Sequence, residues 1–111
     1  MSSKRQGSAV IVVLVTCPTP MVARKIASLL VSHHVAACVN IVPQIESQYW
    51  WKGAVERARE SLLLIKTTAS CFQRLQRAIL AAHPYDVPEI IALPVRAGYQ
   101  PYLRWVHTSL S

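Results

Sequence analysis

Glycine is scarce in this sequence, and several catalytic loop motifs depend on it. Only three of the 111 residues are glycine, and none of them belongs to a glycine-rich phosphate loop or to a nucleophile elbow. The chain also has no pair of acidic residues flanking a histidine, an arrangement typical of acid and base catalysis. We therefore expect a binding protein and not an enzyme.

Acidic residues are few as well. Five Asp and Glu stand against twelve Lys and Arg, which gives a formal net charge of +7. The basic residues are spread from Lys4 to Arg104 and never form a run or an arm that could follow a phosphate backbone. We expect no nucleic-acid partner, and we attribute the charge to solubility.

Paired cysteines and long hydrophobic runs are missing too. Cys17, Cys38 and Cys71 are an odd number without close spacing, unlike a disulfide framework or a zinc finger. The apolar run 9–15 is too short to span a bilayer of about 30 Å, and residues 16–20 offer no signal-peptide cleavage site. These features predict a cytoplasmic protein with no membrane partner.

The hydrophobic pattern predicts one domain of alternating strands and helices. Residues 1–8 are predicted to be a flexible lead-in and residues 9–111 a single domain, because a chain of this length builds one core. Strands are predicted at 9–15, 35–42, 45–51, 55–67 and 87–95, and helices begin at Pro20 after the Thr19 cap, at the Ser70 and Gln73 capping box, and at Pro101. This order is an α+β fold, a ferredoxin-like split βαβ sandwich with a long β-hairpin and a short C-terminal helix.

Two features predict that the chain assembles with copies of itself. Helices would cover one face of the sheet, so the other face, rich in Val, Leu and Ile, needs cover from another chain. The stretch from Val35 to Trp51 would measure about 55 Å at about 3.3 Å per residue, against a domain about 35 Å across. The hairpin must therefore overhang, and we interpret Tyr49, Trp50 and Trp51 near its tip as interface anchors and not as a ligand cage.

Four stretches in a fixed order resemble the CutA family. They are Val35–Pro43 (VAACVNIVP), Ser47–Gly53 (SQYWWKG), Glu60 followed by Lys66 and Thr67, and His83–Glu89 (HPYDVPE) with Pro94 and Val95. The resemblance covers roughly residues 9–110. It implies a homotrimer of ferredoxin-like subunits that takes part in tolerance of copper and other divalent cations.

Some members of that family have a proposed metal site made of a first-strand cysteine and a histidine pair before Pro-Tyr. The alignment places Val15 at the cysteine position, with Cys17 two residues further on. It places Ala82 and His83 at the histidine pair. By resemblance, His83 is a candidate ligand for Cu²⁺ or another divalent cation. Cys17 and Cys38 are further candidates because a thiolate is a soft ligand, and no metal is obligatory. The alternatives are a histidine that bonds carbonyls at a helix end and cysteines that act as small hydrophobic residues.

Polar residues of the recognisable stretches also predict a ligand-binding cleft. Lys66, Tyr85, Glu89 and Glu60 are its candidate lining, and they would bind a small anion or metabolite between subunits. In the alternative interpretation, a buried ion pair and a hydrogen bond fix the last strand. The cleft supports a second functional hypothesis, a signalling trimer that senses a small molecule.

Overall fold

The computed structural model describes residues 9–110, so the predicted lead-in and Ser111 lie outside the described residues. The elements in chain order are β1 (Val10–Cys17), α2 (Pro20–Ser32), β2 (Cys38–Trp51), β3 (Ala54–Thr68), a 3₁₀ turn (Ala69–Cys71), α3 (Phe72–Ala82), β4 (Ile90–Pro94) and α4 (Gln100–Ser109). Over this range no helix combines the length and the apolar character needed to cross a membrane.

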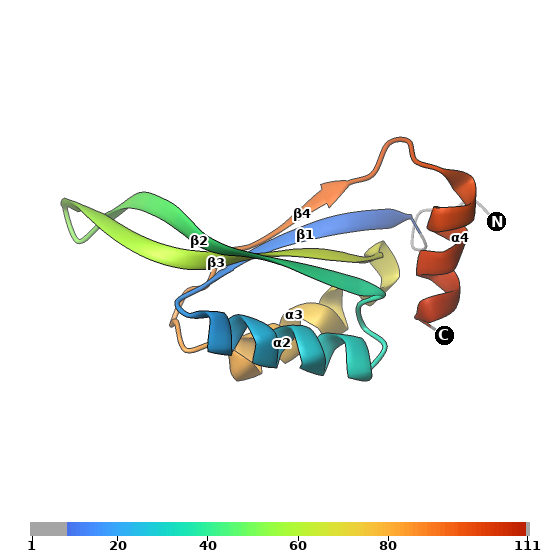
Figure 1. Cartoon of the computed structure of the whole chain (residues 1–111), viewed down its shortest axis with the longest axis horizontal. Coiled ribbons are helices and arrows are strands. Elements are labelled where there is room, and N and C mark those ends of the chain that lie inside the picture. Colours follow the sequence, from blue (N-terminus) through green and yellow to red (C-terminus); the bar gives the residue numbers. More distant parts are fainter. Residues whose placement is uncertain (1–8, 111) are drawn as a thin grey trace.

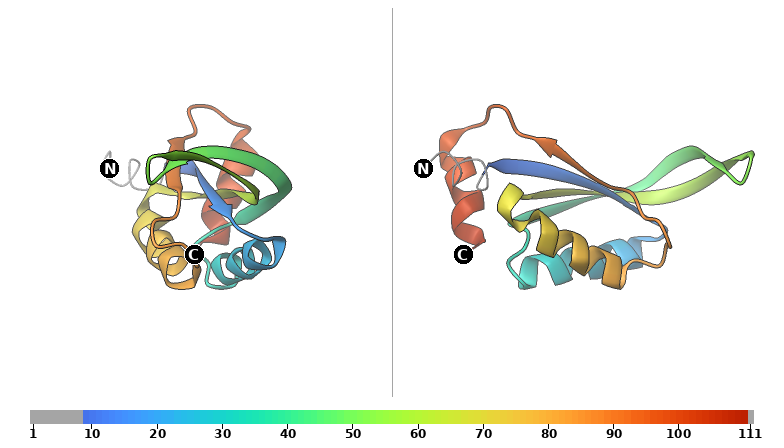
Figure 2. Two further views of the ribbon diagram at one scale, coloured as in Figure 1. Left: turned by 90° about the vertical axis from the view of Figure 1, so that its left-hand side faces the viewer. Right: turned by 180° about the vertical axis from the view of Figure 1, so that it is seen from behind.

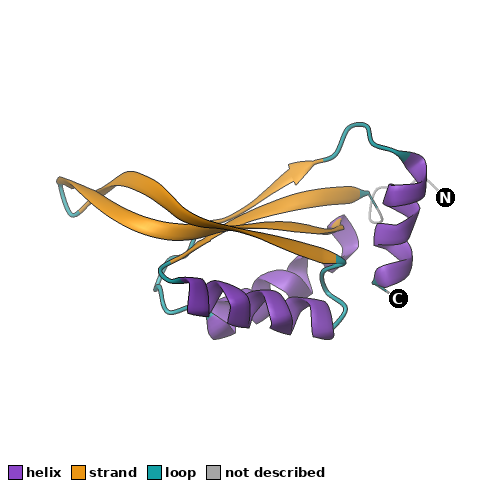
Figure 3. Cartoon of the chain, in the orientation of Figure 1, coloured by secondary structure: helices purple, strands orange, loops and turns teal. Residues whose placement is uncertain are grey.

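The four strands form one antiparallel sheet in the order β2-β3-β1-β4. Helices α2 and α3 lie on one face of this sheet, and α4 stands at the end farthest from the hairpin tip (Figures 1 and 3). The structure confirms the predicted α+β fold with two helices on one face, a long hairpin and a short C-terminal helix.

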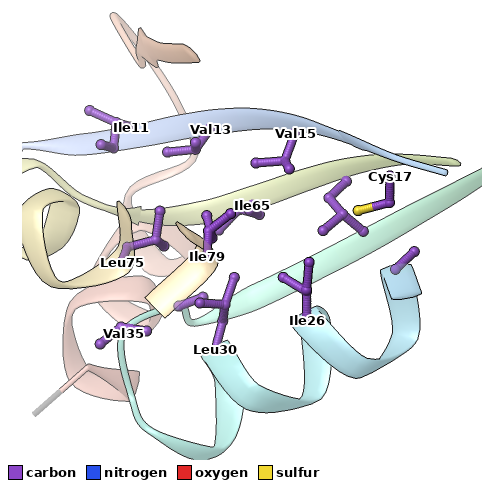
Figure 4. Packing of buried hydrophobic residues seen from close by; sticks show 13 residues of the cluster. Ile11, Val13, Val15, Cys17, Ile26, Leu30, Val35, Ile65, Leu75 and Ile79 are labelled. Atoms are coloured by element: carbon purple, nitrogen blue, oxygen red, sulfur yellow. The ribbon is translucent and has the colours of Figure 1, made fainter. Parts of the chain in front are cut away.

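Alternation along β1 builds the core between the sheet and the two helices. Ile11, Val13, Val15 and Cys17 point toward the helices and are buried. They meet Ile26 and Leu30 of α2 and Leu75 and Ile79 of α3 (Figure 4). Each large aliphatic side chain removed from water contributes about 1.5–3 kcal/mol, so this layer holds β1 at the centre of the fold.

Local capping signals are correct at one helix and wrong at the other. Thr19 caps α2 as predicted, because its Oγ1 accepts a hydrogen bond of 3.2 Å from the backbone N–H of Val22. The predicted capping box of Ser70 and Gln73 is wrong. Residues 69–71 form the 3₁₀ turn, and α3 begins after it without a side-chain cap.

The last strand is shorter than the predicted range 87–95. β4 spans Ile90–Pro94 and, within the described residues, pairs only with β1. Pro88 has no backbone N–H to donate to a ladder, and residues 83–89 form the loop that leads from α3 to β4. This loop reaches the base of the hairpin.

The β2–β3 hairpin projects beyond the rest of the domain (Figures 1 and 2). β1 ends where Cys17 pairs with Ser61, so among residues 9–110 the segment 54–60 of β3 pairs only with β2. The molecule measures 48 Å along its long axis and 26 and 24 Å across. The predicted overhang is therefore confirmed.

A β-bulge controls which side chains of β2 share a face with β3. Val42 pairs with Leu62 and Ile45 pairs with Glu60, so β2 holds one extra residue in this interval. Gln44 takes a positive φ of 58° there, and the bulge falls between the two predicted strands 35–42 and 45–51. Beyond it, Ile45 and every second residue up to Trp51 lie on the same face as Glu60.

The face of the sheet opposite α2 and α3 is lined by aliphatic side chains from three strands. Leu14 of β1 pairs with Leu64 of β3 on one side and with Ile91 of β4 on the other. Ile91 and Leu93 are 48% and 46% exposed. We call this surface, made of Val12, Leu14, Leu62, Leu64, Ile91 and Leu93, the open sheet face.

Candidate functional site

A cavity of about 780 Å³ lies where the hairpin leaves the globule. The end of β1, the outer part of β2, one residue of β3 and the loop between α3 and β4 form its walls. Its lining residues are Thr16, Glu46, Ser47, Gln48, Tyr49, Trp51, Glu60, Pro84, Tyr85, Asp86, Val87 and Glu89. We call it the hairpin cavity.

Glu60 is the buried acidic group of this cavity. Its side chain is only 7% exposed, and its Oε2 accepts a hydrogen bond of 2.8 Å from the hydroxyl of Tyr85. Burial, then this hydrogen bond and the negative charge of Glu60, raise the pKa of Tyr85 well above its usual range. Tyr85 is therefore a neutral donor to Glu60 at physiological pH.

The cavity concentrates the negative charge of a basic chain. Four of the five acidic residues line it, and none of its lining residues is Lys, Arg or His. Glu46 differs from the other three, because it pairs with Arg59 on the face of the ribbon opposite Glu60. The carboxylates of Glu60, Asp86 and Glu89 therefore define its charge, and they favour a cationic ligand over an anion.

The ring of His83 holds the loop before β4 against β1. Its Nδ1 accepts a hydrogen bond of 3.1 Å from the backbone N–H of Tyr85, so Nε2 carries the proton and donates it to the carbonyl of Thr16 at 2.7 Å. The backbone N–H of His83 also caps α3 through the Ile79 carbonyl at 2.8 Å. Because one ring nitrogen accepts and the other donates, neither has a free lone pair for a metal ion.

The candidate ligands Cys17 and Cys38 are also poorly placed to bind a metal ion. Cys17 is fully buried (Figure 4), and burial, followed by the charge of Glu60, raises the pKa of its thiol to about 11. Cys38 pairs with Lys66, five residues along β3 from the Ser61 partner of Cys17. Among residues 9–110, no three His, Cys, Asp or Glu side chains are close enough to share a metal ion.

Lys66 does not join the other predicted cleft residues. Tyr85, Glu60 and Glu89 line the hairpin cavity, whereas Lys66 donates a hydrogen bond to Oδ1 of Asn40 and lies 4.0 Å from the sulfur of Cys38. Neither Lys66 nor Glu89 forms an ion pair within the described range. Of the alternative interpretation, the hydrogen bond is present, from Tyr85 to Glu60, and the described residues contain no ion pair of Lys66 or Glu89.

The aromatic residues of the hairpin separate into two groups. Tyr49 and Trp51 line the cavity, while Trp50 points from the other face of the ribbon and is 75% exposed. Nζ of Lys52 lies 5.8 Å from the ring centroid of Trp51, within the range of a cation–π contact. The interface role expected for all three aromatic residues stays a prediction, and Trp50 is the most exposed of the three.

Sequence reasoning missed several cavity residues, among them Thr16, Ser47 and Asp86. A signal for Asp86 was present, since it stands inside the same HPYDVPE stretch as Tyr85 and Glu89. Thr16 carries no comparable signal, because its place at the cavity follows from the point at which β1 ends.

Comparison with known proteins gives one consistent result. A family model described as CutA1 divalent ion tolerance protein matches residues 11–109. The chain is 48% identical over 93 residues to "Protein CutA homolog" of Danio rerio, covering 84% of this chain and 62% of that protein. It is 50% identical over 93 residues to "Protein CutA" of Mus musculus, covering 84% and 52%. The chain thus spans between half and two thirds of these relatives.

A solved structure shows the same likeness in three dimensions. The fold is similar to that of the divalent cation tolerance protein Cut A1 from Thermus thermophilus, with a TM-score of 0.90 and 48% sequence identity. The match covers 92% of this chain and 99% of that one.

Proposed function

Because the chain belongs to the CutA1 divalent ion tolerance protein family, we propose that it takes part in divalent-cation tolerance as a homotrimer that binds cations and catalyses no reaction. The observation that carries the proposal is the hairpin cavity, where carboxylates gather in a chain of net charge +7. A divalent ion that keeps several of its water molecules needs only one or two carboxylates. We assign this contact to Glu60, Asp86 and Glu89.

Weak, exchangeable binding is the expected outcome of this geometry. The carboxylates do not converge on one point within the described residues, so no closed coordination cage forms. The donor atoms of His83 and Cys17 do not suit copper, because the ring nitrogens are engaged and the thiol stays protonated. A loosely held hydrated ion fits these walls better than a copper centre does.

Assembly into a trimer is supported by two surfaces of the chain. The open sheet face exposes Ile91 and Leu93, and the overhanging ribbon exposes Trp50. Apolar surface of this extent is typical of an interface between subunits. We also propose a cytoplasmic location, since all three cysteines are free thiols.

The second hypothesis, a trimer that senses a small anion, finds no support at this cavity. An anion needs a cationic or N–H-rich site, and the lining contains acidic residues and no Lys or Arg. A sensor of small cations remains compatible with the same walls.

Calorimetric titration with Mn²⁺ tests the proposed cation contact. We expect weak binding to the wild type, and binding reduced in Glu60→Gln and in Glu89→Gln. Glu56→Gln is the matched control, because Glu56 is the acidic residue that does not line the cavity. Equal affinities in all four proteins, or a loss only in His83→Ala and Cys17→Ser titrated with Cu²⁺, would overturn the assignment to the carboxylates.

A further inference from the structure

We propose that the hairpin cavity binds an organic diamine, with one ammonium group at Glu60 and the other at the acidic loop residues Asp86 and Glu89. This inference concerns the cavity of the proposed divalent-ion contact, but it does not require that contact. Three independent features of the cavity lead to a ligand of this class.

The first feature is an unpaired oxygen on a buried carboxylate. Glu60 is 7% exposed, and Tyr85 bonds only to its Oε2. Within residues 9–110 no other group bonds to Oε1, and this oxygen is not among the atoms sealed from solvent. Oε1 is therefore accessible to solvent, on a side chain that lines the cavity. A buried carboxylate is stabilised by a positively charged N–H donor.

The second feature is the spacing of the negative groups. Glu60 belongs to β3, whereas Asp86 and Glu89 belong to the loop before β4, and within the described chain these three carboxylates do not form a group that could hold one metal ion. The cavity of about 780 Å³ has the size of a small-molecule site. Separated anionic walls around such a volume match a ligand with two separated positive charges.

The third feature is an aromatic wall on the side of Glu60. The β-bulge places Tyr49 and Trp51 on the same face of the ribbon as Glu60, and both line the cavity. Aromatic rings attract ammonium groups through their π-faces. Nζ of Lys52, which does not line the cavity, lies 5.8 Å from the Trp51 ring centroid, so we assign the ligand contact to the Tyr49 ring. The methylene groups of a diamine would contact this ring, which a hydrated metal ion cannot do.

The test is calorimetric titration of the assembled wild-type protein with 1,4-diaminobutane. The comparison ligands have the same four-carbon chain and differ in charge. 1-Aminobutane carries one positive charge, 1,4-butanediol carries none, and butanoate carries one negative charge. We expect the diamine to bind about tenfold more tightly than the monoamine, a difference of one charge-assisted hydrogen bond. The diol and butanoate should not bind.

Variants locate the binding. Glu60→Gln should weaken diamine binding about tenfold, and Tyr49→Leu about three- to fivefold through the lost cation–π contact. Glu56→Gln should change it less than Glu60→Gln does, because Glu56 is an exposed residue outside the lining, although it pairs with Tyr49 across the ribbon. Asp86→Asn and Glu89→Gln are exposed loop changes that keep the test informative if Glu60→Gln unfolds.

Several outcomes would overturn the proposal. The first is that no diamine binds at about 10 mM, which would result if a neighbouring subunit fills the cavity. The second is equal affinity for the monoamine and the diamine. The third is an equal loss of diamine affinity in Glu56→Gln and Glu60→Gln. A parallel Mn²⁺ titration separates this result from the proposed function. Diamine binding without Mn²⁺ binding would reject the divalent-ion contact alone, and the reverse would reject the diamine alone.

Discussion

The hydroxyl of Tyr85 donates a hydrogen bond of 2.8 Å to Oε2 of Glu60, and this contact joins the loop before β4 to strand β3. His83 fastens the same loop to β1 through the Thr16 carbonyl at 2.7 Å. Two polar contacts to two different strands therefore fix the loop that forms one wall of the hairpin cavity.

Removing the hydroxyl tests the first of these contacts. Tyr85→Phe should lower the free energy of unfolding by about 1 kcal/mol, because Glu60 loses its hydrogen-bond donor while the ring is kept. Urea denaturation at one fixed protein concentration measures the change, since assembly makes stability concentration-dependent. Tyr99→Phe is the control at a tyrosine that is 76% exposed. Equal losses in the two variants would contradict the role given to Tyr85.

Alkaline pH should destabilise the fold through Cys17. The pKa of its thiol rises from 9.0 to about 11 on folding, so the folded chain retains a proton that the unfolded chain loses between these values. The stabilisation is therefore complete below pH 9 and falls as pH rises to 11, by at most about 2.7 kcal/mol for two pKa units.

Thermal unfolding at pH 8, 9, 10 and 11 and constant ionic strength measures this dependence. Cys17→Ala should be less stable at pH 8, because it leaves a small cavity in the core. Its stability should nevertheless decline less steeply above pH 9 than that of the wild type. Parallel curves for the two proteins would remove Cys17 as the source of the alkaline loss.

The hydrogen bonds of His83 predict its tautomer. Nε2 carries the proton because Nδ1 accepts from the Tyr85 N–H, so long-range ¹H–¹⁵N correlation spectra should show an unprotonated Nδ1. Addition of Zn²⁺ should leave these signals in place, since neither nitrogen is free to coordinate. A spectrum of the Nδ1–H form, or a shift of both nitrogens with Zn²⁺, would restore His83 as a ligand.

The open sheet face makes a prediction about assembly. Ile91→Asp should shift the protein from about three times the 12.4 kDa chain mass toward one, because a charge on this face cannot be covered by apolar side chains. Leu80→Asp is a matched control, since Leu80 on α3 is 49% exposed and Ile91 is 48% exposed. Light scattering that finds both variants trimeric would exclude this face as an interface.

The sequence predicted the elements whose signals are local and missed the contacts that depend on register. Thr19 and Pro20 mark the start of α2 because a side-chain cap and a fixed φ act on adjacent residues. Val87 and Pro88 look like part of a strand, but no partner strand lies beside them within the described residues, so β4 starts only at Ile90. An apolar stretch does not reveal whether a neighbour is present.

In the candidate site, too, local sequence signals identified residues, whereas their contacts depend on strand register. The HPYDVPE stretch identified Tyr85 and Glu89, whereas their meeting with Glu60 depends on how far β3 extends past β1. Lys66 is six residues from Glu60, or about 20 Å along one strand at about 3.3 Å per residue. The cavity extends from Glu60 toward the hairpin tip, as far as Trp51 opposite Ala54, and Lys66 lies in the other direction along β3.

Residues 54–60 of β3 have only β2 beside them within the described chain, and a lone two-stranded ribbon is at best marginally stable in water. The amide protons of the globule are shielded by its own core, whereas those of the outer ribbon depend on what lies against it. In the proposed trimer we therefore expect two regions that exchange with solvent at different rates, and we expect dilution to affect the outer ribbon more strongly than the globule.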